Sequence, residues 1–193
     1  FGPSFFFGLS FRKIVSMTTK KVHSIKPEMF FLLNLPVLDN NNELHTLDQC
    51  IKTYLTPESL TGDNAWYNEE TKQKEDVYME SGFWDIPRVF VVNLSRFSPM
   101  GQKIKHNIDF PIDDFDMSTY MSGYTPQKYV YELYGIINHI GGMNNGHYTS
   151  FVKNSRNEWN HFDDEVIQKV SSENLLKTPH AYCLFYRRKN SLT

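Results

Sequence analysis

The chain has 193 residues, of which 40% are hydrophobic and 22% are charged, with 10 glycines and 9 prolines. This length can bury a substantial core, and the composition does not match a collagenous, disordered or low-complexity chain, so we expect a globular protein. The 20 Lys and Arg residues against 22 Asp and Glu residues give a formal net charge of −2, which provides no general positive field for phosphate backbones and argues against nucleic acid as a partner.

The cysteine content favours a reducing compartment. Cys50 and Cys183 are too few for a disulfide framework, and no Cys-x-x-Cys pair or Cys/His cluster offers ligands for a structural metal. The apolar stretch 5–11 is far shorter than the roughly 18 residues of a membrane span, and it lacks the flanks of a signal peptide. We therefore expect an intracellular protein, cytoplasmic or nuclear, with no membrane partner. The chain starts with Phe1, which we interpret as a start inside a longer protein.

The first third of the chain contains one clear helical signal. Residues 1–28 show too little periodicity to separate strand from loop, and the apolar run 29–38 predicts a buried strand followed by a loop. Thr46 precedes apolar residues at helical spacing, which predicts a helix over 47–55. Cys50 lies on the apolar face of that helix and is expected to be a packed core thiol.

The middle of the chain mixes polar segments with short strands. Residues 58–82 are rich in charged side chains and predict an exposed hairpin or loop region. The β-branched run 89–94 predicts a buried strand. Residues 107–112 and 115–120 predict short extended pieces broken by Pro and Asp.

The last part of the chain predicts several neighbouring strands. They are expected at 129–139, 147–153, 158–162 and 181–187. A serine-capped short helix is predicted at 171–176. Neighbouring strands favour an antiparallel sheet, and the sheet together with the helices gives the fold class α+β.

A loop with three glycines separates His139 from His147. Such a loop can move or let another chain pass close to its backbone. His147 directly follows Gly146 at the start of a predicted strand, so its imidazole is expected at a sheet edge, where a general base can work. The alternative is that either histidine is only a hydrogen-bonded surface residue.

Strand pairing predicts a carboxylate partner for His147. A hairpin with a two- or four-residue loop after the strand 147–153 places His147 opposite Asp164, and one bulge selects Asp163 instead. A carboxylate beside a histidine fixes its tautomer and stabilises the imidazolium, as in the base and orienter of a nucleophilic triad. The alternatives are a structural His–Asp pair or a capping aspartate, and spacing does not choose between the two aspartates.

Several short motifs occur together in one order near the C terminus. Residues 131–170 contain a His-x-Gly loop, then Gly-His-Tyr, then a Trp before Phe-Asp-Asp, and residues 181–188 read Ala-Tyr-Cys-Leu-Phe-Tyr-Arg-Arg. This combination resembles the histidine box of the ubiquitin-specific proteases, which are cysteine hydrolases with a papain-like core. Residues 86–97 resemble the family's Pro-x-x-Leu…Leu-Lys-Arg-Phe strand, and residues 46–50 and 58–64 resemble the helix and loop further back. The resemblance spans roughly residues 7–188.

The resemblance implies the palm and fingers portion of a papain-like α+β fold, with an antiparallel sheet and the N-terminal thumb lobe missing. Residues of about 1–85 would form the fingers and a connecting helix, and about 86–193 the palm with the histidine box. Many family members hold zinc in the fingers with two Cys-x-x-Cys pairs. The matching stretches 17–20 and 68–71 contain no cysteine, so we expect metal-free fingers and no cofactor.

The resemblance also implies a role for each candidate site residue. His147 would be the general base, Asp163 its orienter and Asp164 a helper. The cleft that takes the ubiquitin tail would be lined by three residues, namely His139, Gly146 and Tyr148. The family's nucleophilic cysteine motif is absent from the sequence, and we expect it in the missing N-terminal half.

The activity implied by the resemblance is deubiquitination, a thiol-dependent hydrolysis of the bond after ubiquitin's C-terminal glycine. The expected partners are ubiquitin, ubiquitinated proteins and the missing N-terminal half of the same catalytic domain. The isolated chain is expected to be inactive because it has no nucleophile. The alternative is a catalytically inactive pseudoenzyme that binds ubiquitin or another partner.

Overall fold

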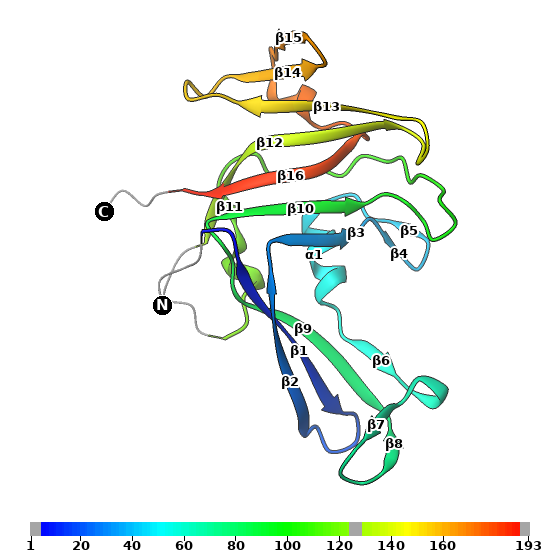
Figure 1. The fold of residues 1–193 in the computed structure, drawn as a ribbon. Coiled ribbons are helices and arrows are strands. Elements are labelled where there is room, and N and C mark those ends of the chain that lie inside the picture. Colours follow the sequence, from blue (N-terminus) through cyan, green and yellow to red (C-terminus); the bar gives the residue numbers. More distant parts are fainter. Residues whose placement is uncertain (1–4, 124–128, 190–193) are drawn as a thin grey trace.

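The computed structural model describes residues 5–123 and 129–189. Two β-sheets make up most of the fold, and an α-helix lies where they meet (Figure 1). Among the described residues, no helix is long and apolar enough to cross a membrane. The content of strands and helix is that of the predicted α+β class.

The smaller sheet has four antiparallel strands and extends away from the rest of the fold (Figure 1). In spatial order they are β2 (Val22–Phe30), β1 (Gly8–Ser16), β9 (Val77–Asp85) and β6 (Glu58–Leu60). The exposed region predicted over 58–82 is wrong at its end, because β9 begins at Val77 and pairs with both β1 and β6. Glu80 and Ser81 interrupt the apolar pattern of this strand, which hid it in the sequence.

The larger sheet is antiparallel apart from one pair of strands. In spatial order it contains β15 (Val166–Lys169), β14 (Trp159–Asp163), β13 (Gly146–Lys153), β12 (Val130–Gly141), β16 (Ala181–Arg188), β10 (Val89–Ser95) and β3 (Leu32–Pro36), with β11 (Phe115–Asp116) beside β12. Among the described strands of this sheet, only β3 and β10 pair in parallel. The strands predicted at 89–94 and in the C-terminal part are confirmed to within two residues. β15 was not predicted, because all four of its residues are exposed and it has no apolar face.

The helix predicted over 47–55 is confirmed as α1 (Leu47–Leu55). Thr46 and Gln49 form a capping box, in which each side chain accepts a hydrogen bond from the other residue's backbone N–H. Leu47, Cys50 and Ile51 on the inner face are completely buried. Burying an apolar side chain of this size contributes about 1.5–3 kcal/mol. Cys50 is therefore the packed core thiol that the pattern predicted.

Several short elements complete the fold. They are β4 (Leu38–Asp39), β5 (Asn42–Glu43), β7 (Trp66–Asn68), β8 (Gln73–Glu75) and 3₁₀ helices at Gly62–Asn64, Met117–Tyr120 and Glu173–Leu176. The single strand predicted over 29–38 is divided among β2, β3 and β4. Residues 107–112 form irregular chain with one isolated bridge at Asp109. Ser172 precedes the last 3₁₀ helix, but its side chain makes no capping hydrogen bond.

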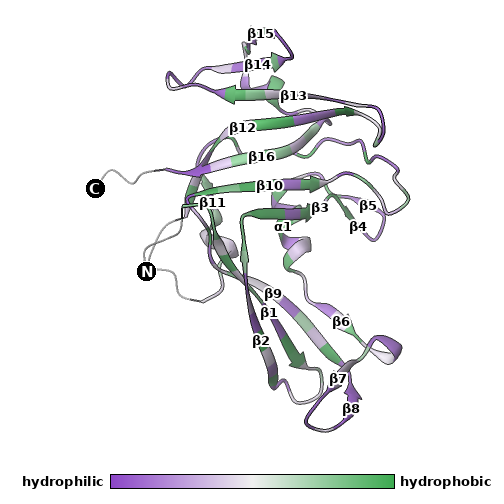
Figure 2. Ribbon diagram, viewed as in Figure 1, coloured by the Kyte–Doolittle hydropathy of each residue, from purple (hydrophilic) through white to green (hydrophobic). Residues whose placement is uncertain are grey.

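The core lies against the larger sheet. Figure 2 shows hydrophobic residues along much of β3 and β10, whereas the β7–β8 hairpin is hydrophilic. Leu35, Val92 and Leu184 are completely buried in this core. The division near residue 85 into fingers and palm stays a prediction, and sheet membership cuts across it because β3 pairs with β10.

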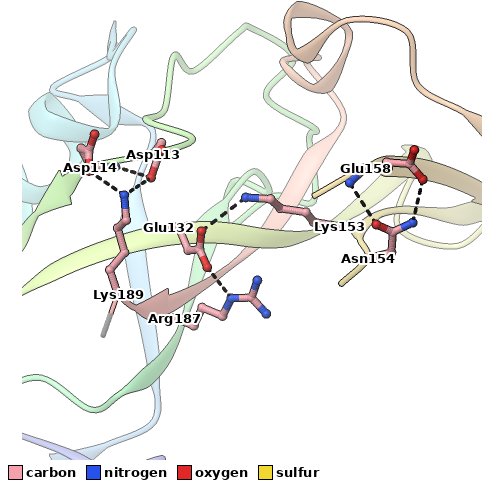
Figure 3. A network of polar contacts seen from close by, with 8 residues as sticks. All are labelled: Asp113, Asp114, Glu132, Lys153, Asn154, Glu158, Arg187 and Lys189. Carbon is pink, nitrogen blue, oxygen red and sulfur yellow. Dashed lines mark hydrogen bonds and ion pairs between the residues drawn. The ribbon is translucent and has the colours of Figure 1, made fainter. Parts of the chain in front are cut away.

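Polar bonds tie the central strands of the larger sheet together at the ends away from the glycine-rich loop (Figure 3). Glu132 on β12 accepts hydrogen bonds from Arg187 on β16 at 2.7 Å and from Lys153 on β13 at 3.3 Å. Burial raises the pKa of Glu132, but the bonds from these two cations outweigh it, so that the pKa is lowered overall. Lys189, just after β16, bonds Asp113 and Asp114 and holds the segment before β11.

Candidate active site

His147 and Asp163 form a direct hydrogen bond at one end of the larger sheet. His147 Nε2 lies 2.6 Å from Asp163 Oδ1, and both side chains are about half exposed. Because a carboxylate only accepts hydrogen bonds, Nε2 carries the proton. This bond, with weaker attraction from Asp164, raises the pKa of His147. Nδ1 of His147 has no hydrogen-bond partner in the described part of the chain, so it is available to another group.

Neither predicted register of the β13–β14 hairpin is correct. Ser150 pairs with Phe162, one residue beyond the register that would set His147 opposite Asp164. The cause is a longer loop, in which the Asn154 side chain accepts hydrogen bonds from the backbone of Arg156 and Glu158. The ladder ends at Phe162, and Asp163 reaches His147 diagonally from beyond its end.

Asp164 starts the turn between β14 and β15 and has a positive φ of 49°. Asp164 is close to both members of the pair, because the potential metal-binding atoms of His147, Asp163 and Asp164 all lie within 4.8 Å of one another. The Nε2 atom of His147 is already engaged by Asp163. Asp164 is therefore placed to act on His147 by its charge rather than by the direct bond.

His139, which is predicted to line the cleft for the ubiquitin tail, is buried. It is 5% exposed, and the rings of Phe97, Tyr148 and Tyr182 pack around it. Lys103 Nζ lies 3.1 Å from His139 Nδ1 and donates to its backbone carbonyl at 2.6 Å. Burial first, and then the charge of Lys103, lower the pKa of His139.

A shallow cavity of about 490 Å³ lies beside the His–Asp pair. It is lined by Ile137, Tyr148, Thr149, Ser150, Phe162, Asp164, Tyr182 and Cys183. The exposed Tyr148 ring stands at this cavity, one residue after His147. Burial raises the pKa of the Cys183 thiol to about 11, as it does for Cys50, so both thiols are protonated near neutral pH.

Arg96 is a buried residue near the site that sequence reasoning did not single out. The residue is 1% exposed, and its guanidinium donates to the backbone carbonyls of Ala181, Ile104 and His106. These bonds join the start of β16 to the segment that carries Lys103. Arg96 lay inside a recognised strand motif, but Lys103 lies in a polar segment that has no local signal for its contact with His139.

Comparison with known proteins agrees with this fold. The family model described as "Ubiquitin carboxyl-terminal hydrolase" matches residues 6–186. Ubiquitin carboxyl-terminal hydrolase 8 of Arabidopsis thaliana is 38% identical over 147 residues, which are 74% of this chain and 17% of that protein. The human ubiquitin carboxyl-terminal hydrolase 19 is 37% identical over 159 residues, covering 76% of this chain and 12% of that protein.

Solved structures of the SAGA DUB module have the same fold. The module of Ubp8, Sgf11, Sus1 and Sgf73 bound to monoubiquitin matches with a TM-score of 0.83 and 29% identity, over 97% of this chain and 41% of that chain. The module bound to ubiquitin aldehyde matches with a TM-score of 0.81. The chain thus spans less than a fifth of these curated relatives and about two fifths of the solved chains. It has their papain-like α+β fold, and it belongs to the ubiquitin carboxyl-terminal hydrolase family.

Proposed function

We propose that this chain supplies the general base, its orienting carboxylate and part of the ubiquitin-binding surface of a cysteine-type deubiquitinase. The observation that carries the proposal is the 2.6 Å hydrogen bond from His147 Nε2 to Asp163, which leaves Nδ1 available to a thiol. Asp164 adds negative charge nearby and acts as a helper. The family match supports the same chemistry.

In the proposed reaction, His147 Nδ1 takes the proton of a cysteine thiol while Asp163 accepts the Nε2 hydrogen bond. The thiolate attacks the carbonyl carbon of ubiquitin's C-terminal glycine, and the imidazolium returns the proton to the leaving amine, which gives a thioester. The same imidazole then removes a proton from water, and the water hydrolyses the thioester and regenerates the thiol. Asp163 stabilises the imidazolium in both halves of the reaction.

The nucleophile in this proposal lies outside these 193 residues. Cys50 is completely buried in the core under α1, and the pKa of each thiol is raised to about 11, which suits neither for attack. Both cysteines are free thiols, which supports the proposed intracellular location, cytoplasmic or nuclear.

We assign the ubiquitin tail to the end of the sheet around Gly146 and Tyr148. Both residues flank His147, and Tyr148 is well exposed, as a substrate-contacting ring must be. Residues of about 1–85 would act as fingers and about 86–193 as palm. Solved relatives of this chain hold monoubiquitin or ubiquitin aldehyde, which supports ubiquitin and ubiquitinated proteins as partners.

The test is hydrolysis of a ubiquitin C-terminal amide by the 193-residue chain and by the same chain extended upstream with its native sequence. We expect turnover only from the extended protein, and its loss in the His147→Ala variant. Ubiquitin binding without turnover in the extended protein would instead support a binding-only pseudoenzyme. Turnover that persists in His147→Ala would contradict the assigned base.

A further inference from the structure

Gly146 lies directly on the imidazole of His139. His139 pairs with Tyr148 across β12 and β13, and residues 146 and 148 point to the same face of the sheet. A Cβ atom built on Gly146 would overlap His139 Nε2 and lie 2.8 Å from Cε1 and 2.9 Å from Cδ2, closer than real Cβ atoms come. The backbone immediately before His147 therefore rests on this ring.

Both the backbone and the ring of His139 are held by hydrogen bonds. The backbone N–H of His139 donates to the carbonyl of His180, and Lys103 donates to the backbone carbonyl and to Nδ1 of His139. An ammonium group only donates, so Nδ1 must be the acceptor and the proton of the neutral imidazole resides on Nε2. The ring is also buried and packs against the rings of Phe97 and Tyr148, which oppose its movement away from Gly146.

The alignment of His147 with Asp163 depends on the position of this backbone. A hydrogen bond weakens when its donor–acceptor distance or angle departs from the favoured range. The 2.6 Å between His147 Nε2 and Asp163 Oδ1 is already short, so the two atoms cannot come closer without repulsion. His147 is the residue after Gly146, so a shift of Gly146 away from or into the sheet moves the imidazole of His147 relative to the carboxylate.

We propose that His139 is a positioning residue whose neutral imidazole, held by Lys103, supports Gly146 and so sets His147 against Asp163. This inference rests on the proposed function for its catalytic meaning, since the aligned pair is the proposed base and orienter. It also changes the role expected for His139, from contact with the ubiquitin tail to support of the residue that carries the base. Its geometry can be tested without a nucleophile.

The test is an NMR titration of the His147 side chain in the 193-residue chain, compared among glycine variants. In Gly146→Ala the new methyl group must displace either the strand or the ring, and we expect the pKa of His147 to fall toward that of an unpaired histidine. Gly142→Ala is the matched control in the same loop, because a Cβ there meets no described atom within 4 Å. We expect it to leave the pKa of His147 unchanged.

A double variant separates support by His139 from general damage to the strand. In His139→Ala/Gly146→Ala the methyl group occupies space that the imidazole has vacated, so the pKa of His147 should be higher than in Gly146→Ala alone. Lys103→Met, which keeps the length of the side chain, should lower the pKa of His147 and raise that of His139. If Gly146→Ala unfolds the chain, the pKa of His147 in Lys103→Met and in His139→Ala still tests the inference.

Three results would overturn the inference. They are an unchanged pKa of His147 in Gly146→Ala, an unchanged pKa of His147 in both His139→Ala and Lys103→Met, and a double variant with a pKa as low as that of Gly146→Ala. These outcomes are separate from the hydrolysis test. Loss of the proposed function would leave the titration result standing, and a negative titration would leave the roles of His147 and Asp163 open to the hydrolysis test.

Discussion

Asp163 accepts a hydrogen bond from His147 Nε2 at 2.6 Å although the two residues are not paired across β13 and β14. The ladder ends one residue earlier, and Asp163 approaches diagonally because β14 turns at Asp164. The bond is thus separate from the backbone pairing of the two strands. A carboxylate can be changed to an amide here without altering the ladder.

Substitutions at the three site residues should lower the hydrolysis rate in a definite order. In the upstream-extended protein we expect His147→Ala to lower kcat by about 10³-fold or more, because the proton acceptor is lost. Asp163→Asn should cost about 10²-fold, since the imidazolium loses its hydrogen-bonded anion. Asp164→Asn should cost less than Asp163→Asn, because it acts only by charge at a greater distance.

The matched control for this series is Glu165→Gln, which removes a neighbouring exposed carboxylate in the same turn. It should leave kcat unchanged. Ubiquitin affinity, measured by titration, should be the same in all four variants. A larger loss for Asp164→Asn than for Asp163→Asn would transfer the orienting role to Asp164.

The two cysteines should be unreactive in the folded chain. A pKa of about 11 against an ordinary value of 9.0 leaves each thiol with about 10²-fold less thiolate near neutral pH. We expect iodoacetamide to modify Cys50 and Cys183 slowly at pH 7.5 and quickly in urea. Mass spectrometry measures the extent of modification over time. Fast native modification of Cys183, together with hydrolysis by the 193-residue chain that Cys183→Ala abolishes, would show that this thiol is a nucleophile after all.

The β7–β8 hairpin and its contact with β2 of the smaller sheet should lose stability in acid. Glu75 bonds His23 at 3.0 Å and accepts from Asn68 at 3.3 Å, while the His23 ring stacks on Trp66. Hydrogen bonds from Ser16 and then His23 lower the pKa of Glu75 from 4.5 to about 2. A lowered carboxyl pKa contributes stability that is present above pH 4.5 and is lost as the pH falls toward 2.

Amide hydrogen exchange at Trp66 and Asn68 measures this effect as a function of pH. Glu75→Gln should lower the protection of these amides against exchange already at neutral pH. It should also flatten the pH dependence of that protection between pH 4.5 and 2. Glu69→Gln, an exposed carboxylate in the same hairpin, is the control and should behave like the unchanged chain.

Since we expect metal-free fingers, a chelator should leave the Tm unchanged, and a fall in Tm on adding EDTA would disprove that expectation.

Arg96 should be important for stability. Its removal takes the donor from two buried carbonyl groups and one partly buried carbonyl group, and each unsatisfied buried group costs about 1–3 kcal/mol. We therefore expect Arg96→Met to lower the free energy of unfolding by about 3 kcal/mol or more. Arg96→Lys keeps the charge but cannot form the same fork of bonds, so its free energy of unfolding should lie between those of Arg96→Met and the unchanged chain.

Urea denaturation followed by circular dichroism measures the free energies. Arg156→Met, an exposed arginine in the β13–β14 loop, serves as the control and should change the free energy of unfolding by less than about 0.5 kcal/mol. An Arg96→Met variant as stable as this control would show that the neighbouring carbonyls find other donors.

Local patterns were sufficient for the elements whose determinants lie within a few residues. The helix over 47–55 was predicted at its observed bounds because Thr46 and its apolar spacing are local signals. The strands at 89–94 and 147–153 were predicted for the same reason, since β-branched runs and flanking turn residues mark them. An aspartate partner for His147 was also expected from sequence spacing, although both registers on which that expectation rested are wrong and the spacing left Asp163 and Asp164 open.

Tertiary structure alone decided the features that depend on residues far apart in the sequence. The hairpin register depended on how the Asn154 side chain folds its loop, and the choice of Asp163 depended on where the ladder ends. His139 and Lys103 are 36 residues apart, so no local pattern could show that the histidine is buried and held in place. The sequence by itself determined which side chains can carry out acid–base chemistry, because that is a property of residue type and spacing. Only the packing of distant segments determined how each of them is charged, covered and aligned.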